Sequence, residues 1–234
     1  MINNIILMFR NIIYKILIFF ISIEFIKSII ILTESNQGNI NGYFYALGYH
    51  DNTGKVKMSI NENNFTCYWK NIDSSVSFQY GKIIDPQKTL DELGNVIINY
   101  ETQINSEGYI FTGIIGIGDI YELFSIIEYY SDEFVPFGIS LGTMFIDDGE
   151  YEIYYNEMIV SQTHIDGTNK QIAFYSVRKE KRLKGTINLN KHFESWKKKG
   201  CKFELLSRIS FIVEGNKSNG NVMVNQLEIK YEKN

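Results

Sequence analysis

The chain has 234 residues, which is enough for one domain with a sizeable core. Its charge is mixed and slightly acidic, formally -4, so it lacks the basic surface of a nucleic-acid-binding protein. Aromatic residues make up 15% of the chain and there are only 2 Pro, a composition that favours many short strands, turns and an aromatic-lined surface.

Residues 1–36 differ in kind from the rest. A positively charged start is followed by an apolar run at 16–23, which is typical of a secretory signal. Glu24 and Lys27 interrupt the apolar stretch and no small-x-small cleavage site follows. A membrane anchor is the alternative, but a span needs about 20 apolar residues. We therefore expect a secreted, extracellular protein with no membrane contact in its mature form and one domain at 37–234.

The cysteines and histidines do not indicate a functional site. Cys67 and Cys201 pair if the compartment is oxidising, and two free buried thiols are the alternative. The three histidines are widely spaced and do not have the spacing of a zinc site, so no metal is expected.

From Gly42 onward, short alternating segments recur between turn signals, which is typical of an all-β sandwich. Asp147-Asp148-Gly149 predicts a hairpin between two strands within 138–160. Residues 85–93 contain Pro86 and are interpreted as a loop. The other expected strands cover 43–50, 55–62, 63–71, 74–82, 95–104, 108–130, 169–178, 205–215 and 221–232.

One helix is predicted near the end of the chain. Asn190 is a good N-cap and Gly200 a natural C-terminal stop. Phe193 and Trp196 lie three residues apart, so they share one face of this helix. The three lysines that follow favour the negative end of the helix dipole and indicate a solvated last turn.

Two acids stand out within apolar strands. In the segment SIIEYY, strict alternation places Ile126, Glu128 and Tyr130 on one face. Burying an unpaired charge is costly, so this carboxylate is expected in an aromatic-lined groove. Glu214 ends a second apolar strand, ISFIVEG. Two carboxylates on two strands are what two-carboxylate glycoside hydrolysis requires. Two exposed strand glutamates are the alternative.

Further motifs occur in a fixed order along the chain. They are EYY at 128–130, DDGEYEIY at 147–154, HIDGT at 164–168, YSVRKEKR at 175–182, GTINLNKHFESWKKKG at 185–200, and VEG followed by SNG at 213–220. In this order and spacing, from 41 to 229, the chain resembles the family 11 glycoside hydrolases, the small β-jelly-roll xylanases.

The resemblance implies a β-jelly-roll sandwich of two curved antiparallel sheets with a single α-helix. It implies retaining hydrolysis of internal β-1,4 bonds of xylan by a monomer that needs no cofactor. Glu128 would be the nucleophile and Glu214 the general acid and then base, with their carboxyl groups about 5–5.5 Å apart. Tyr130 would line the cleft and orient the nucleophile.

The chain departs from the family's pattern at the positions where members of the family bind the sugar substrate. The thumb tip, Pro-Ser-Ile in the family, is Thr163-His164-Ile165 here. Counting back from the nucleophile without gaps, Asp119 replaces a tyrosine that contacts the nucleophile and the sugar, and Tyr121 replaces a tryptophan. Arg208 replaces the tyrosine before the acid/base strand. Ile165, Asp119, Tyr121 and Tyr130 are therefore the expected substrate-binding residues.

The altered binding shell leaves a second function open. A jelly-roll protein that binds plant polysaccharide without cutting it, or cuts it weakly, is the alternative to the xylanase. The retention of both glutamates in their motifs favours the enzyme.

Overall fold

The computed structural model describes residues 29–49, 53–61, 64–118, 122–161 and 169–233. Within these ranges the chain forms 13 strands and two helices. In chain order they are β1 Ile30–Leu32, β2 Asn36–Ile40, β3 Tyr43–Tyr49, β4 Lys55–Asn61, β5 Asn64–Lys70, β6 Ser75–Thr89, α2 Leu90–Leu93, β7 Asn95–Ile117, β8 Glu122–Tyr130, β9 Ile139–Ile146, β10 Gly149–Ser161, β11 Asn169–Arg178, β12 Lys184–Asn188, α3 Leu189–Lys197 and β13 Leu205–Glu232.

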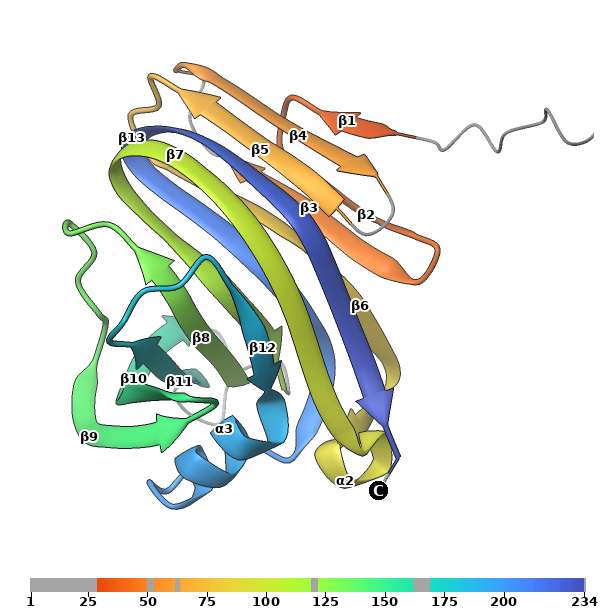
Figure 1. Cartoon of the computed structure of the whole chain (residues 1–234), viewed down its shortest axis with the longest axis vertical. Coiled ribbons are helices and arrows are strands. Elements are labelled where there is room, and N and C mark those ends of the chain that lie inside the picture. Colours follow the sequence, from red (N-terminus) through yellow and green to blue (C-terminus); the bar gives the residue numbers. More distant parts are fainter. Residues whose placement is uncertain (1–28, 50–52, 62–63, 119–121, 162–168, 234) are drawn as a thin grey trace, which may run out of the picture.

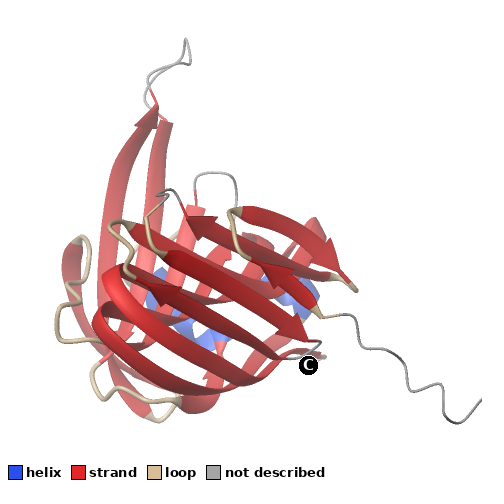
Figure 2. Ribbon diagram, turned by 90° about the horizontal axis from the view of Figure 1, so that it is seen from above, coloured by secondary structure: helices blue, strands red, loops and turns tan. Residues whose placement is uncertain are grey.

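All the strands join one strongly curved sheet. Its main path runs β1-β4-β5-β13-β7-β8-β11-β10-β9, while β12 pairs with β7, β6 pairs with β13 and β3, and β2 pairs with β3. The long strands β7 and β13 run side by side in an arc, with the two helices at its lower end (Figure 1). The view from above shows the strands stacked in layers over the helices (Figure 2).

This architecture confirms the predicted all-β jelly-roll fold and corrects two details. The two layers form one hydrogen-bonded sheet, because β7 and β13 are long enough to belong to both: residues 208–216 pair with 109–117, and residues 219–232 pair with 95–107. The sheet is also not wholly antiparallel, since β8 and β11 pair in parallel.

The main core lies between the layers and is closed by α3. Phe193 and Trp196 are buried, as their spacing predicted. Trp196 donates its indole N–H to Ser176 at 2.9 Å, and His192 bonds the same hydroxyl. The helix begins slightly earlier than predicted, because Asn188 is its N-cap and accepts a hydrogen bond from the Lys191 N–H.

Several connections predicted as turns are regular structure. The predicted loop at 85–93 is the end of β6 followed by α2, which begins with a capping box between Thr89 and Glu92. The predicted turn at 105–108 lies within β7, and the turn expected between 215 and 221 lies within β13. At the second of these turns, the pairing register with β7 shifts between Asn216 and Asn219, so the strand bends there without ending.

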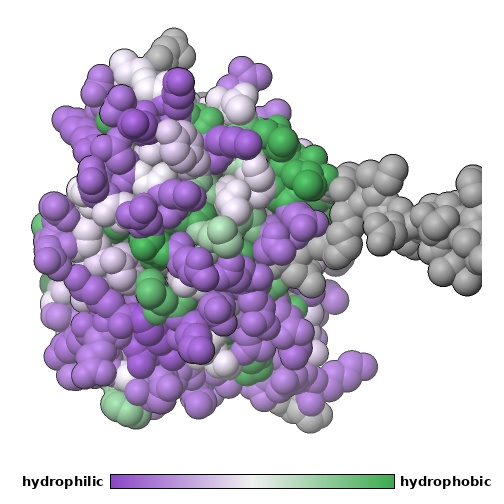
Figure 3. Space-filling view, turned by 45° about the horizontal axis from the view of Figure 1, so that its top comes forward, coloured by the Kyte–Doolittle hydropathy of each residue, from purple (hydrophilic) through white to green (hydrophobic). Residues whose placement is uncertain are grey.

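The described part of the chain begins before the predicted domain boundary at residue 37. β1 pairs with β4, and Leu32 is packed into the main core. Ile29 and Ile31 remain exposed, and Figure 3 shows hydrophobic side chains gathered beside the grey N-terminal segment. The signal predicted at residues 1–36 falls mostly outside the described residues. Among the residues described, no helix has the length and apolarity to cross a membrane.

The two cysteines are not bonded to each other. Cys67 and Cys201 are both buried free thiols, which answers the question that the sequence left open. Burial raises the pKa of Cys67 well above its ordinary value and that of Cys201 to about 11, so both are protonated at neutral pH.

Candidate active site

One face of the sheet carries Glu214, and we call it the Glu214 face. Side chains alternate along β13, so Arg208, Ser210, Ile212 and Glu214 share this face, while the residues between them enter the main core. On the neighbouring strands, Phe111 lies opposite Glu214 and Tyr130 opposite Phe111.

The Glu214 face has its own apolar cluster, separate from the main core. Its buried members are Phe111, Ile127, Phe134, Val177 and Ile212, and the partly buried side chains packed on them are Tyr109, Ile115, Tyr130 and Tyr154. The rings of Phe111, Tyr109 and Tyr130 all contact Phe134, at centroid distances of 5.1–6.0 Å. The predicted aromatic-lined surface therefore surrounds Glu214.

The environment of Glu214 favours its protonated form. Burial raises its pKa from 4.5 to about 7. Burial, and after it the Glu214 charge, raises the pKa of Tyr109 to about 12. Burial also raises the pKa of Tyr175; a hydrogen bond from Asn156 lowers this pKa, and the Glu214 charge raises it. The two tyrosines therefore lie near this carboxyl. A carboxylic acid that keeps its proton near neutral pH is suited to act as a general acid.

The raised pKa of Glu214 has a measurable effect on stability. Because the folded-state pKa lies above the unfolded value, the contribution is fully present below pH 4.5 and is lost as pH rises through 7. At about 1.4 kcal/mol per pKa unit, the wild type should lose about 3 kcal/mol relative to Glu214→Gln between pH 4 and 8. Urea unfolding of both proteins at the two pH values measures this, and an equal stability difference at both would contradict it.

Glu128 lies on the opposite side of the sheet and is fully buried. Tyr100 donates its hydroxyl to one carboxylate oxygen at 2.6 Å, and Tyr151 donates to the other at 2.5 Å. Arg182 forms an ion pair with it through Nε, and its backbone N–H donates to the Glu128 carbonyl at 2.9 Å. The Glu128 carboxylate is thus held inside the main core, and the two tyrosines belong to that core.

A β-bulge on β8 explains why Glu128 and Tyr130 lie on different faces of the sheet. Thr112 pairs with Tyr129 and Gly113 with Ile127, so Glu128 is the extra residue on β8. A Cβ atom on Gly113 would lie 2.0 Å from the Ile126 carbonyl oxygen, so only glycine allows the strands to approach this closely. The prediction that Ile126, Glu128 and Tyr130 share a face is therefore wrong for Tyr130: Ile126 and Glu128 both point into the main core, whereas Tyr130 lies on the Glu214 face, because strict alternation is interrupted between Ile127 and Tyr129.

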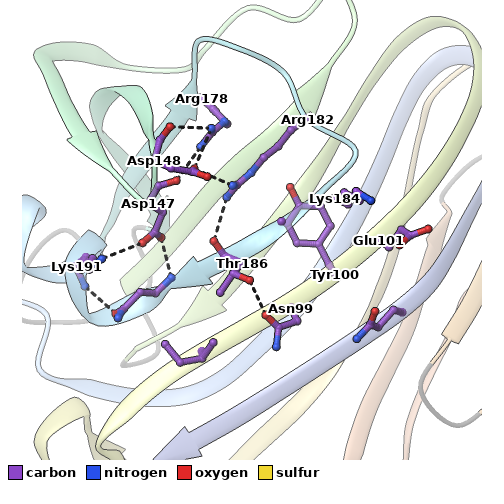
Figure 4. A pocket seen from close by; sticks show the side chains of 14 residues that line it. Asn99, Tyr100, Glu101, Asp147, Asp148, Arg178, Arg182, Lys184, Thr186 and Lys191 are labelled. Atoms are coloured by element: carbon purple, nitrogen blue, oxygen red, sulfur yellow. Dashed lines mark hydrogen bonds and ion pairs between the residues drawn. The ribbon is translucent and has the colours of Figure 1, made fainter.

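Two partners of Glu128, Tyr100 and Arg182, line a cavity of about 850 Å³ (Figure 4). Arg182 donates to Asp148 at 3.1 Å and to the Thr186 carbonyl at 3.2 Å. Arg178 donates to the Tyr151 hydroxyl at 3.0 Å and also reaches Asp148. The buried carboxylate is therefore the end of a continuous hydrogen-bonded network that reaches the surface.

This network raises the pKa of Arg182. Burial alone would lower it, but the charge of Glu128 and a hydrogen bond to Glu128 outweigh that effect. Sequence reasoning missed Tyr100, Tyr151 and Arg182 as partners of Glu128. Arg182 lies within the YSVRKEKR motif, but nothing in that motif indicates which carboxylate it faces.

The other predicted binding residues are only partly described. Tyr130 lies on the Glu214 face, where its hydroxyl donates to the Arg178 carbonyl at 3.1 Å. Asp119, Tyr121 and Ile165 lie outside the described residues. Within the described ranges, no three His, Cys, Asp or Glu side chains are grouped so as to hold a metal ion.

A jelly-roll fold that carries a carboxylic acid with a raised pKa on a tyrosine-lined face is the arrangement found in glycoside hydrolases of this fold. The family model of the glycosyl hydrolases family 11 matches residues 40–225. The chain therefore belongs to glycosyl hydrolases family 11.

Curated relatives and solved structures agree with this assignment. An endo-1,4-beta-xylanase A of Bacillus pumilus is 33% identical over 205 residues, which cover 85% of this chain and 86% of that protein. One of Thermoclostridium stercorarium is 31% identical over 207 residues, 85% of this chain and 31% of that protein, so the chain spans about a third of its length. The family 11 xylanase from Neocallimastix patriciarum has the same fold, with a TM-score of 0.75, 22% identity, and coverage of 87% of this chain and all of that one.

Proposed function

We propose that this chain is a secreted endo-1,4-β-xylanase that hydrolyses internal bonds of xylan by double displacement. The observation that carries the proposal is Glu214, whose burial beside Tyr109 and Tyr175 raises its pKa to about 7. Membership of the family and the xylanase relatives supply the substrate class.

In the proposed reaction, Glu214 donates its proton to the oxygen that leaves the sugar. The nucleophile, which we propose to be Glu128, attacks the anomeric carbon and forms a covalent glycosyl-enzyme. Glu214, now ionised, then takes a proton from the water that releases the sugar. Tyr109 and Tyr130 lie on the same face as Glu214 and offer ring surfaces for the sugar chain.

The role of Glu128 requires a change of conformation. Its carboxylate would have to leave Tyr100, Tyr151 and Arg182, and the bulge on β8 would have to move to the N-terminal side of Glu128. Alternation would then run unbroken from Glu128 to Tyr130 and place both side chains on the same face. In the proposed cycle, the inward position is therefore a resting state that substrate binding converts.

The second candidate function is binding of xylan without cleavage. The observation that favours it is the complete burial of Glu128 in its ion pair with Arg182. With this carboxylate inward, the Glu214 face retains an acid and its aromatic side chains but lacks the proposed nucleophile.

A covalent trap separates the two candidates. The wild type, Glu128→Gln and Glu214→Gln are incubated with a 2-deoxy-2-fluoroxylobioside that has an activated leaving group, and the peptides are analysed by mass spectrometry. The xylanase proposal expects the label on Glu128 in the wild type, together with reducing-sugar release from xylan but not from glucan or mannan. Binding of xylan without label or release would replace it with the second candidate. A label on another residue would reassign the nucleophile.

We further propose that the protein is secreted and acts as a monomer. The charged start and apolar run within residues 1–36 support a signal segment. Because β1 contributes Leu32 to the core, we propose that any cleavage falls before Ile30. Mass spectrometry of the exported protein gives its first residue directly.

A further inference from the structure

Arg208 is a cation on the Glu214 face that has no acidic partner among the described residues. Its guanidinium lies 4.2 Å from the centre of the Phe44 ring. Its Nε atom is buried and has no hydrogen-bond acceptor. Burial lowers its pKa, and no neighbouring carboxylate offsets this effect. Arg208 is half-buried, and a guanidinium with a buried, unpaired donor is normally stabilised by a carboxylate, so this position lacks the group that would complete it.

Other polar atoms beside Arg208 also lack partners. Ser210 follows Arg208 on the same face of β13, and its hydroxyl is fully buried without a hydrogen bond. Gln79 lies opposite Ile212 on β6, so it is on this face too, and its side-chain carbonyl is buried and unpaired. Buried polar atoms in folded proteins are nearly all satisfied. Ser210 has no solvent exposure, so the half-buried Arg208 and Gln79 are the two side chains of this set that a ligand on the Glu214 face can reach.

We propose that this part of the Glu214 face binds a uronic acid side group of the xylan chain, with Arg208 paired to its carboxylate. The inference rests on the proposed function, because it assigns a substrate class to the same site. The carboxylate would pair with the Arg208 guanidinium, and hydroxyl groups of the sugar would bond the Gln79 side chain.

The chemistry of the guanidinium selects this ligand over an undecorated chain. Xylan without acidic side groups is neutral, and its hydroxyls would not offset the cost of burying a cation. A guanidinium offers parallel N–H donors that fit a carboxylate with two hydrogen bonds. Phe44 holds the guanidinium plane by a cation–π contact, so the donors are oriented before the ligand arrives.

Calorimetry with a pair of matched ligands tests this proposal at pH 6. One ligand is a xylo-oligosaccharide that carries a single glucuronic acid, and the other is the same molecule with the carboxyl group reduced to an alcohol. Both are titrated into Glu214→Gln, in which turnover is expected to be strongly slowed. We expect the acid to bind about ten- to a hundredfold more tightly, since hydrogen bonds to charged groups are the stronger class.

Adding Arg208→Gln should remove this preference and leave the affinity for the reduced ligand within about twofold. Adding Lys57→Gln instead, which removes an exposed positive charge from β4, should keep the preference. Equal binding of the two ligands by Glu214→Gln, or a preference that survives Arg208→Gln, would overturn the uronic acid site but not the xylanase. Binding of neither ligand would overturn the proposed function and the uronic acid site with it.

Discussion

Replacing Arg182 by leucine is expected to destabilise the protein by about 3–5 kcal/mol, because removal of one partner leaves a buried charge uncompensated. The Glu128 carboxylate has no solvent exposure, and the Arg182 side chain is only 14% exposed. Tyr100 and Tyr151 remain as donors in the variant but supply no positive charge. The free energy of unfolding from urea titration measures the effect.

The neighbouring residue offers a matched control. Lys181 pairs with Asp132 at 2.7 Å, but Asp132 is 98% exposed, so Lys181→Leu should cost less than about 1 kcal/mol. In the double variant Glu128→Gln/Arg182→Leu, both charges are gone, and part of the loss should be recovered. A loss in Arg182→Leu no larger than in Lys181→Leu would show that Glu128 is not held by the ion pair in solution.

Replacing Glu214 by glutamine is expected to reduce kcat on xylan by about 10²- to 10⁴-fold, the usual contribution of a general acid. The amide keeps the shape of the side chain but has no proton to give to the leaving oxygen. Because the carboxyl group is costly to ionise at its buried position, the same variant should be more stable than the wild type above pH 7.

These opposite effects distinguish a catalytic role from damage to the fold. A variant that loses activity and stability together at pH 8 would point to a structural role for Glu214. An active variant would exclude Glu214 as the general acid. Rate measurements on an aryl xyloside with a good leaving group add a further check, since such a substrate needs little protonation and its first step should be far less affected.

The fold was predictable because its signals are local. Alternating hydrophobicity located most strands, and Asp147-Asp148-Gly149 located the β9–β10 hairpin, in which both aspartates have positive φ. The continuous paths of β7 and β13 were not predictable, because turn-forming residues such as those at 105–108 are accommodated when long-range pairing with another strand outweighs their local preference.

The site was predictable in part, for a physical reason. Glu214 ends an apolar strand and obeys simple alternation, and it lies among the aromatic side chains that the sequence predicted around Glu128. The orientation of Glu128 relative to Tyr130 depends on one extra residue between Ile127 and Tyr129, and a one-residue change reverses the face of the side chains that follow it. The glycine that allows this bulge, Gly113, lies on another strand, so the sequence around Glu128 does not reveal it.

The strand order also governs when the protein becomes able to fold. β13 joins β5, β6 and β7 and follows the other described strands in the sequence, so the centre of the sheet is missing until residues 205–232 have been synthesised. Its contacts with β5 connect residues about 150 positions apart, and such long-range pairing makes folding slow. A nascent chain would therefore stay open until residues 205–232 have emerged.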